Sequence, residues 1–153
     1  MYAIFKENEE VNAMHDLTRL VKSLPKYPLL GINVPAGFPS PARDYIENFL
    51  DLNELMITNP AATYFVRVEG YSMSNANILP GDILVVDRSA EVTHNKIVIA
   101  IIEGELTVKR FKIRNNEYWL YPENDGFKPI KIEEWMDFSV WGVVTWIIHK
   151  ALA

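Results

Sequence analysis

With 153 residues, 49% of them hydrophobic, the chain can bury a core, which excludes global disorder and predicts one domain with an appendage. Its 15 basic and 20 acidic residues give a net charge of −5, which argues against direct, specific DNA binding because a phosphate backbone calls for a broad basic surface. The absence of cysteine fits a reducing compartment, so we expect a cytoplasmic protein.

The first 36 residues differ from the rest of the chain. Residues 9–24 show a weak helical pattern of apolar residues. Five prolines then follow within seventeen residues, namely Pro25, Pro28, Pro35, Pro39 and Pro41. Because proline lacks an N–H donor and fixes φ, this stretch is expected to be an extended, poorly paired arm. Such an arm leaves no room for a helix-turn-helix with a core of its own.

No membrane segment is expected. Charged residues stand close to the N-terminus, among them Lys6, Glu7, Glu9 and Glu10, so we expect no apolar signal core there. Near the other end, the uncharged run at residues 140–148 is nine residues long, whereas a helix needs about 20 to span a bilayer.

A short helix is predicted after the arm, from Pro41 to about Leu50. Ser40 is suited to the N-cap and Pro41 to the first helical position. Tyr45 and Phe49 would then face the core. Asn59-Pro60 predicts the turn that closes this region.

From Thr63 onward the pattern is that of short β-strands. Alternation and β-branched residues predict seven strands, at residues 63–68, 83–86, 97–102, 105–114, 118–121, 129–132 and 138–148. Glu103-Gly104 and Asn115-Asn116 predict hairpin turns, since glycine and asparagine tolerate positive φ. The sequence therefore predicts an all-β body of antiparallel strands with a short helix and an N-terminal arm.

Ser72 follows the first predicted strand, in Gly70-Tyr71-Ser72-Met73. A serine nucleophile needs an adjacent base, and none of the three histidines lies in a context that indicates a triad. Lysine is a known substitute for histidine in this role. A polar turn is the alternative interpretation of this segment, because serine and asparagine favour turns.

Lys109 is the only charged residue on the apolar side of its predicted strand, a side it shares with Thr107, Phe111 and Ile113. A lysine there must reach solvent, find a partner or be neutral. Burial lowers the pKa of a lysine, which would suit it to act as a base. A side chain that reaches solvent at the sheet edge is the alternative interpretation. The opposite side, with Arg110, is expected to be a solvated strand face.

Other polar and aromatic residues have simpler interpretations. Four acidic residues are expected to serve as caps, turn residues and surface charges, and no metal or cofactor is expected: Asp51, Glu54, Asp82 and Asp87. The four tryptophans are expected in the core or at an interface: Trp119, Trp135, Trp141 and Trp146. Ala36-Gly37 could be an ordinary flexible joint.

Taken together, several segments resemble UmuD-like proteins, which belong with the LexA-like self-cleaving serine peptidases. The segments are Ala36-Gly37-Phe38-Pro39-Ser40-Pro41-Ala42, Ala61-Ala62-Thr63-Tyr64-Phe65-Val66, Gly70-Tyr71-Ser72-Met73, Gly81-Asp82-Ile83-Leu84-Val85-Val86-Asp87 and Glu105-Leu106-Thr107-Val108-Lys109-Arg110. The resemblance covers the chain from about residue 34 to the end. Tyr71 departs from it, because these proteins often have an acidic residue there, and the arm is longer than theirs.

The resemblance implies a serine–lysine dyad of Ser72 and Lys109 and self-cleavage of the Ala36–Gly37 bond. It divides the chain into an arm at residues 1–36 and a peptidase and dimerisation domain at residues 37–153. It further implies a homodimer whose cleavage is stimulated by the RecA filament on single-stranded DNA during the SOS response. The shortened form would then join a UmuC-like polymerase, as in DNA polymerase V, for error-prone translesion synthesis.

Two alternatives remain open. One is a LexA-like transcriptional regulator that lacks its own DNA-binding domain. The other is a non-catalytic interaction module. The acidic balance argues against the first, and the presence of both Ser72 and Lys109 argues against the second.

Overall fold

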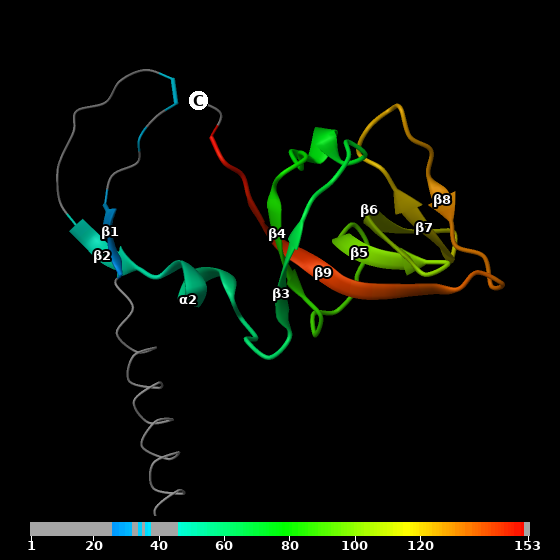
Figure 1. Cartoon of the computed structure of the whole chain (residues 1–153), viewed down its shortest axis with the longest axis horizontal. Helices are drawn as coiled ribbons and strands as arrows, with labels where there is room; N and C mark the ends of the chain where they lie inside the picture. The colour runs from blue at the N-terminus through cyan, green and yellow to red at the C-terminus, as the bar shows by residue number, and fades with distance from the viewer. Residues whose placement is uncertain (1–25, 32–33, 35, 38–45, 152–153) are drawn as a thin grey trace, which may run out of the picture. The chain divides into compact units, whose positions relative to one another are not determined.

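The computed structural model describes residues 26–31, 34, 36–37 and 46–151, and it divides into two units, Met1–Leu55 and Met56–Ala153 (Figure 1). Each unit is described by itself. The helical pattern at residues 9–24 lies outside the described residues.

In the first unit, β1 (Tyr27–Leu30) and β2 (Ile46–Leu50) form a two-stranded antiparallel sheet, with Tyr27 opposite Leu50. The expectation of a poorly paired arm is therefore wrong for β1, although this segment is extended as expected. Pro28 is tolerated because a two-stranded sheet has only edge strands, where a missing N–H donor can face solvent.

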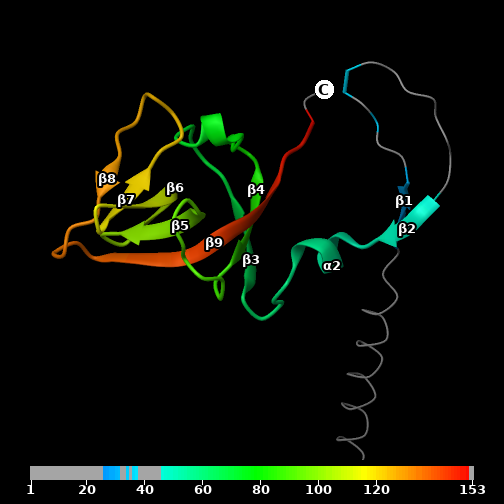
Figure 2. The same ribbon diagram turned by 180° about the vertical axis from the view of Figure 1, so that it is seen from behind.

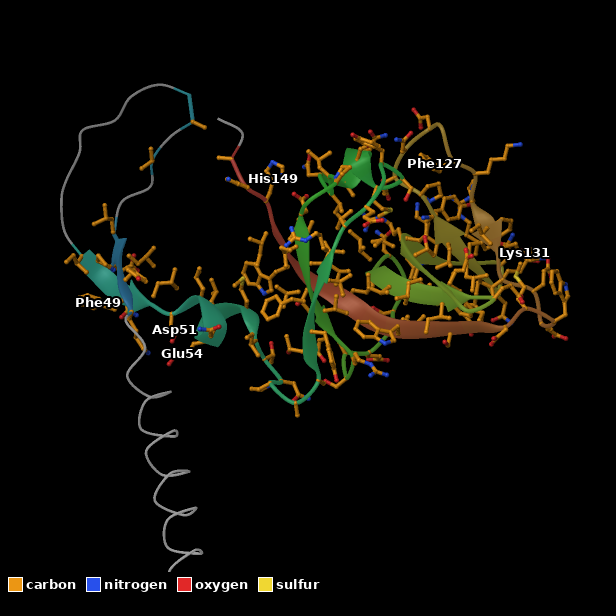
Figure 3. All side chains as sticks on the ribbon, in the orientation of Figure 1. Phe49, Asp51, Glu54, Phe127, Lys131 and His149 are labelled. Carbon is orange, nitrogen blue, oxygen red and sulfur yellow. The ribbon has the colours of Figure 1, made fainter. Side chains whose placement is uncertain are left out.

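The helix predicted from Pro41 to Leu50 is wrong over Ile46–Leu50, which form β2, and residues 41–45 lie outside the described residues. The helix propensity of so short a segment is weak, and hydrogen-bonded pairing with β1 overrides that propensity. The short helix, α2 (Leu52–Met56), begins later. Asp51 caps it, with its Oδ1 accepting a hydrogen bond from the Asn53 N–H at 2.8 Å (Figure 3).

The body is an antiparallel sheet of seven strands in the order β3-β4-β9-β5-β6-β7-β8, seen from two sides in Figures 1 and 2. Its strands are β3 (Thr63–Arg67), β4 (Ile83–Asp87), β5 (Ile97–Ile102), β6 (Glu105–Arg114), β7 (Glu117–Tyr121), β8 (Ile130–Lys131) and β9 (Phe138–Ile148). The all-β prediction and the seven predicted strands are confirmed. Neither helix of the described residues, α2 or the 3-10 helix η1 (Ser74–Ala76), has the length and hydropathy of a bilayer-spanning segment.

Both predicted hairpin turns are confirmed by their backbone angles. Glu103 and Gly104 have φ of 49° and 81°, and Asn115 and Asn116 have φ of 49° and 64°. Positive φ at both central residues matches the right-handed twist of the flanking strands. These turns fix β5, β6 and β7 side by side, and so fix which residues of β6 face the core.

Two clusters of buried side chains form the core. The first contains Val68, Met73, Ile78, Leu84, Val86 and Ile99. The second contains Val98, Ala100, Phe111, Leu120 and Val143. The long strand β9 serves both clusters because it pairs with β4 on one side and β5 on the other, and the register shifts once in each pairing.

The tryptophans differ in burial. Trp119 and Trp141 are half-buried, and Trp141 packs against the first core cluster. Trp135 and Trp146 are exposed, at 77% and 42%. The expected core position is therefore met by Trp141, and an interface position for the other three stays a prediction.

The four acidic residues have the expected local roles. Besides the cap at Asp51, Asp82 accepts a hydrogen bond from the Leu79 N–H at 2.8 Å, and Asp87 accepts one from the Ser89 N–H at 2.7 Å. Glu54 forms a surface ion pair with Lys26 at 2.7 Å.

Gly142 of β9 lies close to Val86 of β4. A Cβ added there would lie 2.6 Å from Cγ1 of Val86, which is fully buried and cannot move aside without disturbing the core. We therefore expect Gly142→Ala to lower the free energy of unfolding by about 1–3 kcal/mol. Urea unfolding measures this change. Ser139→Ala, at an exposed position of the same strand, should change it by no more than about 0.5 kcal/mol, and equal effects would contradict the packing explanation.

Candidate active site

Ser72 lies in a loop that connects β3 to β4. Two backbone hydrogen bonds close the base of this loop, from the Val68 N–H to the Asp82 oxygen at 2.9 Å and from the Gly81 N–H to the Val68 oxygen at 3.0 Å. Gly70 has a φ of 79°, a conformation that glycine adopts without strain, and it turns the chain out of β3 just before the serine.

The segment after β7 holds the turn that carries Ser72. The Glu123 N–H donates to the Ser72 oxygen at 2.8 Å, and the Asn75 N–H donates to the Glu123 oxygen at 2.8 Å. The Asn124 side chain donates to the Tyr71 oxygen at 2.8 Å. From inside, Met73 anchors the turn, with 2% of its surface exposed.

Lys109 of β6 points at Ser72. Its Nζ lies 3.0 Å from the Ser72 Oγ, 2.8 Å from the Thr107 Oγ1 and 2.9 Å from the Val108 oxygen. Lys109 is 8% exposed, so it does not reach solvent as the alternative interpretation held. The fold thus brings together two side chains that are 37 residues apart in the sequence.

The surroundings of Lys109 favour its neutral form. Burial lowers the pKa of its ammonium below the ordinary value. Its three hydrogen-bond partners are a serine hydroxyl, a threonine hydroxyl and a backbone oxygen, and none of them carries a negative charge. A lysine with these properties can accept a proton from a neighbouring hydroxyl.

A cavity of about 300 Å³ opens beside Ser72. Its walls are largely apolar, formed by Val66, Val68, Met73, Ile99, Val108 and Trp141. Ser72, Thr107 and the charged residues Arg67 and Glu69 also line it. This space can receive small or apolar side chains of a polypeptide next to the serine hydroxyl.

Ala36 and Gly37 belong to the N-terminal unit, where both are exposed and lie in a bend. A Cβ added to Gly37 would have no atom within 4 Å. Of the four site residues expected from the sequence, the structure brings together Ser72 and Lys109. The Ala36–Gly37 bond is described within its own unit.

Sequence reasoning missed several residues of this site. Thr107 is expected on the same strand face as Lys109, but the sequence assigns it no role. Its spacing of two residues from Lys109 was the signal that could have indicated a contact. Glu123 and Asn124 gave no signal, because they are far from Ser72 in the sequence and meet the serine turn only in the folded structure. Arg110 was expected on a solvated face, but it is half-buried and forms an ion pair with Glu123.

Comparison with known proteins identifies the family. Residues 28–145 match the Peptidase S24-like family. The chain belongs to this family of serine peptidases. It is 46% identical over 125 residues to ImpA of Escherichia coli, covering 80% of this chain and 83% of ImpA. It is 45% identical over 113 residues to MucA of Escherichia coli, covering 73% of this chain and 77% of MucA.

The LexA repressor of Colwellia psychrerythraea is more distant. It is 39% identical over 124 residues, which span 80% of this chain but 58% of the repressor. ImpA and MucA are UmuD homologues. The resemblance of this peptidase S24-like chain to UmuD-like proteins, with LexA further off, is therefore confirmed.

Proposed function

We propose that this chain is a self-cleaving serine endopeptidase of SOS mutagenesis, in which Ser72 cuts the Ala36–Gly37 bond with Lys109 as the general base. The observation that carries the proposal is the 3.0 Å contact between the Ser72 Oγ and the Nζ of a buried lysine. The family match supports the reaction class, since its members are serine peptidases.

The reaction starts with neutral Lys109. Its Nζ takes the Ser72 hydroxyl proton as the Oγ attacks the carbonyl carbon of Ala36. Collapse of the tetrahedral intermediate breaks the bond to the Gly37 nitrogen, and Lys109 gives that nitrogen the proton. Water then attacks the ester between Ser72 and Ala36 as Lys109 takes its proton. The bond from the Ala36 carbonyl carbon to the Ser72 Oγ breaks, Lys109 returns the proton to the Oγ, and Ala36 is released as a carboxylate.

Thr107 and Val108 hold the base in place. Their oxygens lie 2.8 and 2.9 Å from the Nζ of Lys109, so they restrict a flexible side chain to one orientation toward Ser72. Because both partners are uncharged, they orient the amine without the increase in pKa that a carboxylate would cause.

Backbone N–H groups of the serine turn are proposed to stabilise the oxyanion. Among the hydrogen bonds of the described residues, none uses the Ser72 N–H as donor. This group is therefore available to the negative oxygen that develops on Ala36 during attack.

Small residues at the scissile bond suit the cavity beside Ser72, whose walls are largely apolar. Val34, which precedes the bond by two residues, is 83% exposed in the N-terminal unit and offers an apolar side chain to such a cavity. Cleavage would also cut the connection between β1 and β2. Because an isolated two-stranded sheet is marginally stable, the cut would favour release of β1 and expose the edge of β2.

The processed protein is expected to begin at Gly37 and to contain 117 residues, the 153 of the chain minus 36. Gly37→Trp should block cleavage by crowding the cleft around the scissile bond. The fold should be unaffected, since a Cβ at Gly37 meets nothing within 4 Å. Intact-mass measurement of the cleaved protein tests the site, and a different new N-terminus would show that the bond is wrongly assigned.

The partners follow from the UmuD-like resemblance. The RecA filament on single-stranded DNA would favour the state in which the arm is docked, a population shift that needs no RecA residue in the chemistry. The processed homodimer, in the cytoplasm, would then serve a UmuC-like, error-prone translesion polymerase. Incubation with RecA, nucleotide and single-stranded DNA tests this step, and an unchanged cleavage rate would contradict it.

A LexA-like regulator is the second candidate, favoured by the 39% identity to the Colwellia repressor. A gel-shift assay with operator DNA separates the two. The peptidase proposal expects no shift, whereas a specific shift would favour the regulator.

A further inference from the structure

We infer that the ion pair between Arg110 and Glu123 positions the serine turn against Lys109, and that both are positioning residues for the dyad. The inference rests on the proposed function. It concerns how the nucleophile is held, and neither side chain is expected to touch the substrate.

The ion pair connects the two halves of the dyad through the folded chain. Arg110 directly follows Lys109 on β6, and its Nε donates to the Glu123 Oε1. Glu123 in turn brackets the turn by two backbone hydrogen bonds of 2.8 Å, one to the Ser72 oxygen and one from the Asn75 N–H. The base and the nucleophile are therefore joined by a second connection besides their direct contact.

The turn needs such a connection because it lies outside the sheet. Residues 71–73 belong to no strand, so the β-ladder does not fix their distance from β6. Glu123 also lies beyond the end of β7, outside the β-ladder, and the ion pair with Arg110 ties it to β6. Arg110 provides that anchor and is itself held by a second bond, from its Nη1 to the Asn95 oxygen at 2.8 Å.

Burial strengthens the pair. The side chains of Arg110 and Glu123 are 22% and 27% exposed, whereas those of Lys131 and Glu117, an ion pair between β8 and the start of β7, are 35% and 44% exposed. Solvent screens the first pair less than the second. The Lys131–Glu117 pair makes no contact with the serine turn among the described residues, so it provides a matched control.

The test compares Glu123→Ala, Arg110→Ala, the double variant and Glu117→Ala at a pH where parent cleavage is fastest. A displacement of about 1 Å at a reacting group costs up to about 100-fold in rate, so we expect about a tenfold loss for each single variant. The double variant should cleave no more slowly than Arg110→Ala, because each single change already breaks the same ion pair. Glu117→Ala should cleave at the parent rate, and Glu123→Gln, which keeps an acceptor for Arg110, should be faster than Glu123→Ala.

A second readout excludes a general structural effect. A small fluorophosphonate reacts when the Ser72 Oγ displaces fluoride and Lys109 takes the hydroxyl proton, and it needs no docked arm. Its labelling rate should fall by the same factor as cleavage in Glu123→Ala, while the midpoint of the pH profile stays in place because the burial of Lys109 is unchanged. The thermal midpoint of Glu123→Ala can fall more than that of Glu117→Ala, because its pair is less exposed, but it should stay above the assay temperature.

Two results would overturn the inference and leave the dyad in place. One is cleavage and labelling of Glu123→Ala at the parent rate. The other is a loss of rate that follows a loss of thermal stability, with Glu117→Ala equally affected. A parent protein that neither cleaves nor labels in a Ser72-dependent way would overturn both this inference and the proposed function.

Discussion

Ser72→Ala is expected to abolish self-cleavage while leaving the fold of the body intact. The Ser72 hydroxyl lies 3.0 Å from the Lys109 Nζ, and its removal eliminates the proposed nucleophile. Loss of one member of a nucleophile–base pair lowers the rate by about a thousandfold or more. Intact mass followed over time, with the RecA filament present and absent, measures the loss.

Stability should change little in this variant, because the serine side chain is half-buried and makes one hydrogen bond, to Lys109. Ser139→Ala, which removes an exposed hydroxyl from β9, should cleave at the parent rate. Processing of Ser72→Ala at the normal rate would place the nucleophile elsewhere in the chain.

The strands of the body could be predicted because each carries its own local signal. β5 is rich in β-branched residues, and β6 alternates between an apolar and a charged side. Glycine or asparagine stands where the chain must take positive φ, at Gly104 and Asn116. Each of these signals depends on a few neighbouring residues, so the strands can be recognised before their pairing in the sheet is known.

The N-terminal sheet could not be predicted in the same way. β2 has five residues, and its partner β1 lies across a connection of 15 residues, from 31 to 45, with no local turn signal to pair them. Ser40 and Pro41 suggested a helix start, but these signals describe single positions. Pairing with a distant strand decided the structure of Ile46–Leu50.

For the site, the sequence indicated the two chemical groups and missed what holds them. The position of Lys109 on the apolar side of β6 predicted its burial, which the structure confirms. Alternation shows which face a residue occupies but not which partner it meets. The ion pair of Arg110 with Glu123 and the bond from the Glu123 N–H to the Ser72 oxygen therefore had to come from the fold.

Lys109 is expected to give self-cleavage a characteristic dependence on pH. Burial lowers the pKa of its ammonium, and only the neutral amine can take the Ser72 proton. Below the lowered pKa, Lys109 is protonated and the rate is low. The rate should rise as pH increases through that pKa and level off above it.

Substitution of Lys109 separates a base from a fixed charge. Lys109→Arg keeps the positive charge and much of the length, but arginine does not lose its proton in proteins, so this variant should be as inactive as Lys109→Ala. A lysine that acted only as a structural cation would give the opposite result, with Lys109→Arg active.

The most direct test of the serine–lysine mechanism is the first-order rate of spontaneous cleavage from about pH 6 to about pH 10, a range that brackets a lysine pKa shifted down from about 10.4. It should be measured for the parent, Lys109→Arg and Lys109→Ala. We expect a rising and then level profile for the parent, with a rate at least about a thousandfold lower in both variants. An active Lys109→Arg protein, or a parent rate that stays flat across this range, would contradict the assignment of Lys109 as the general base.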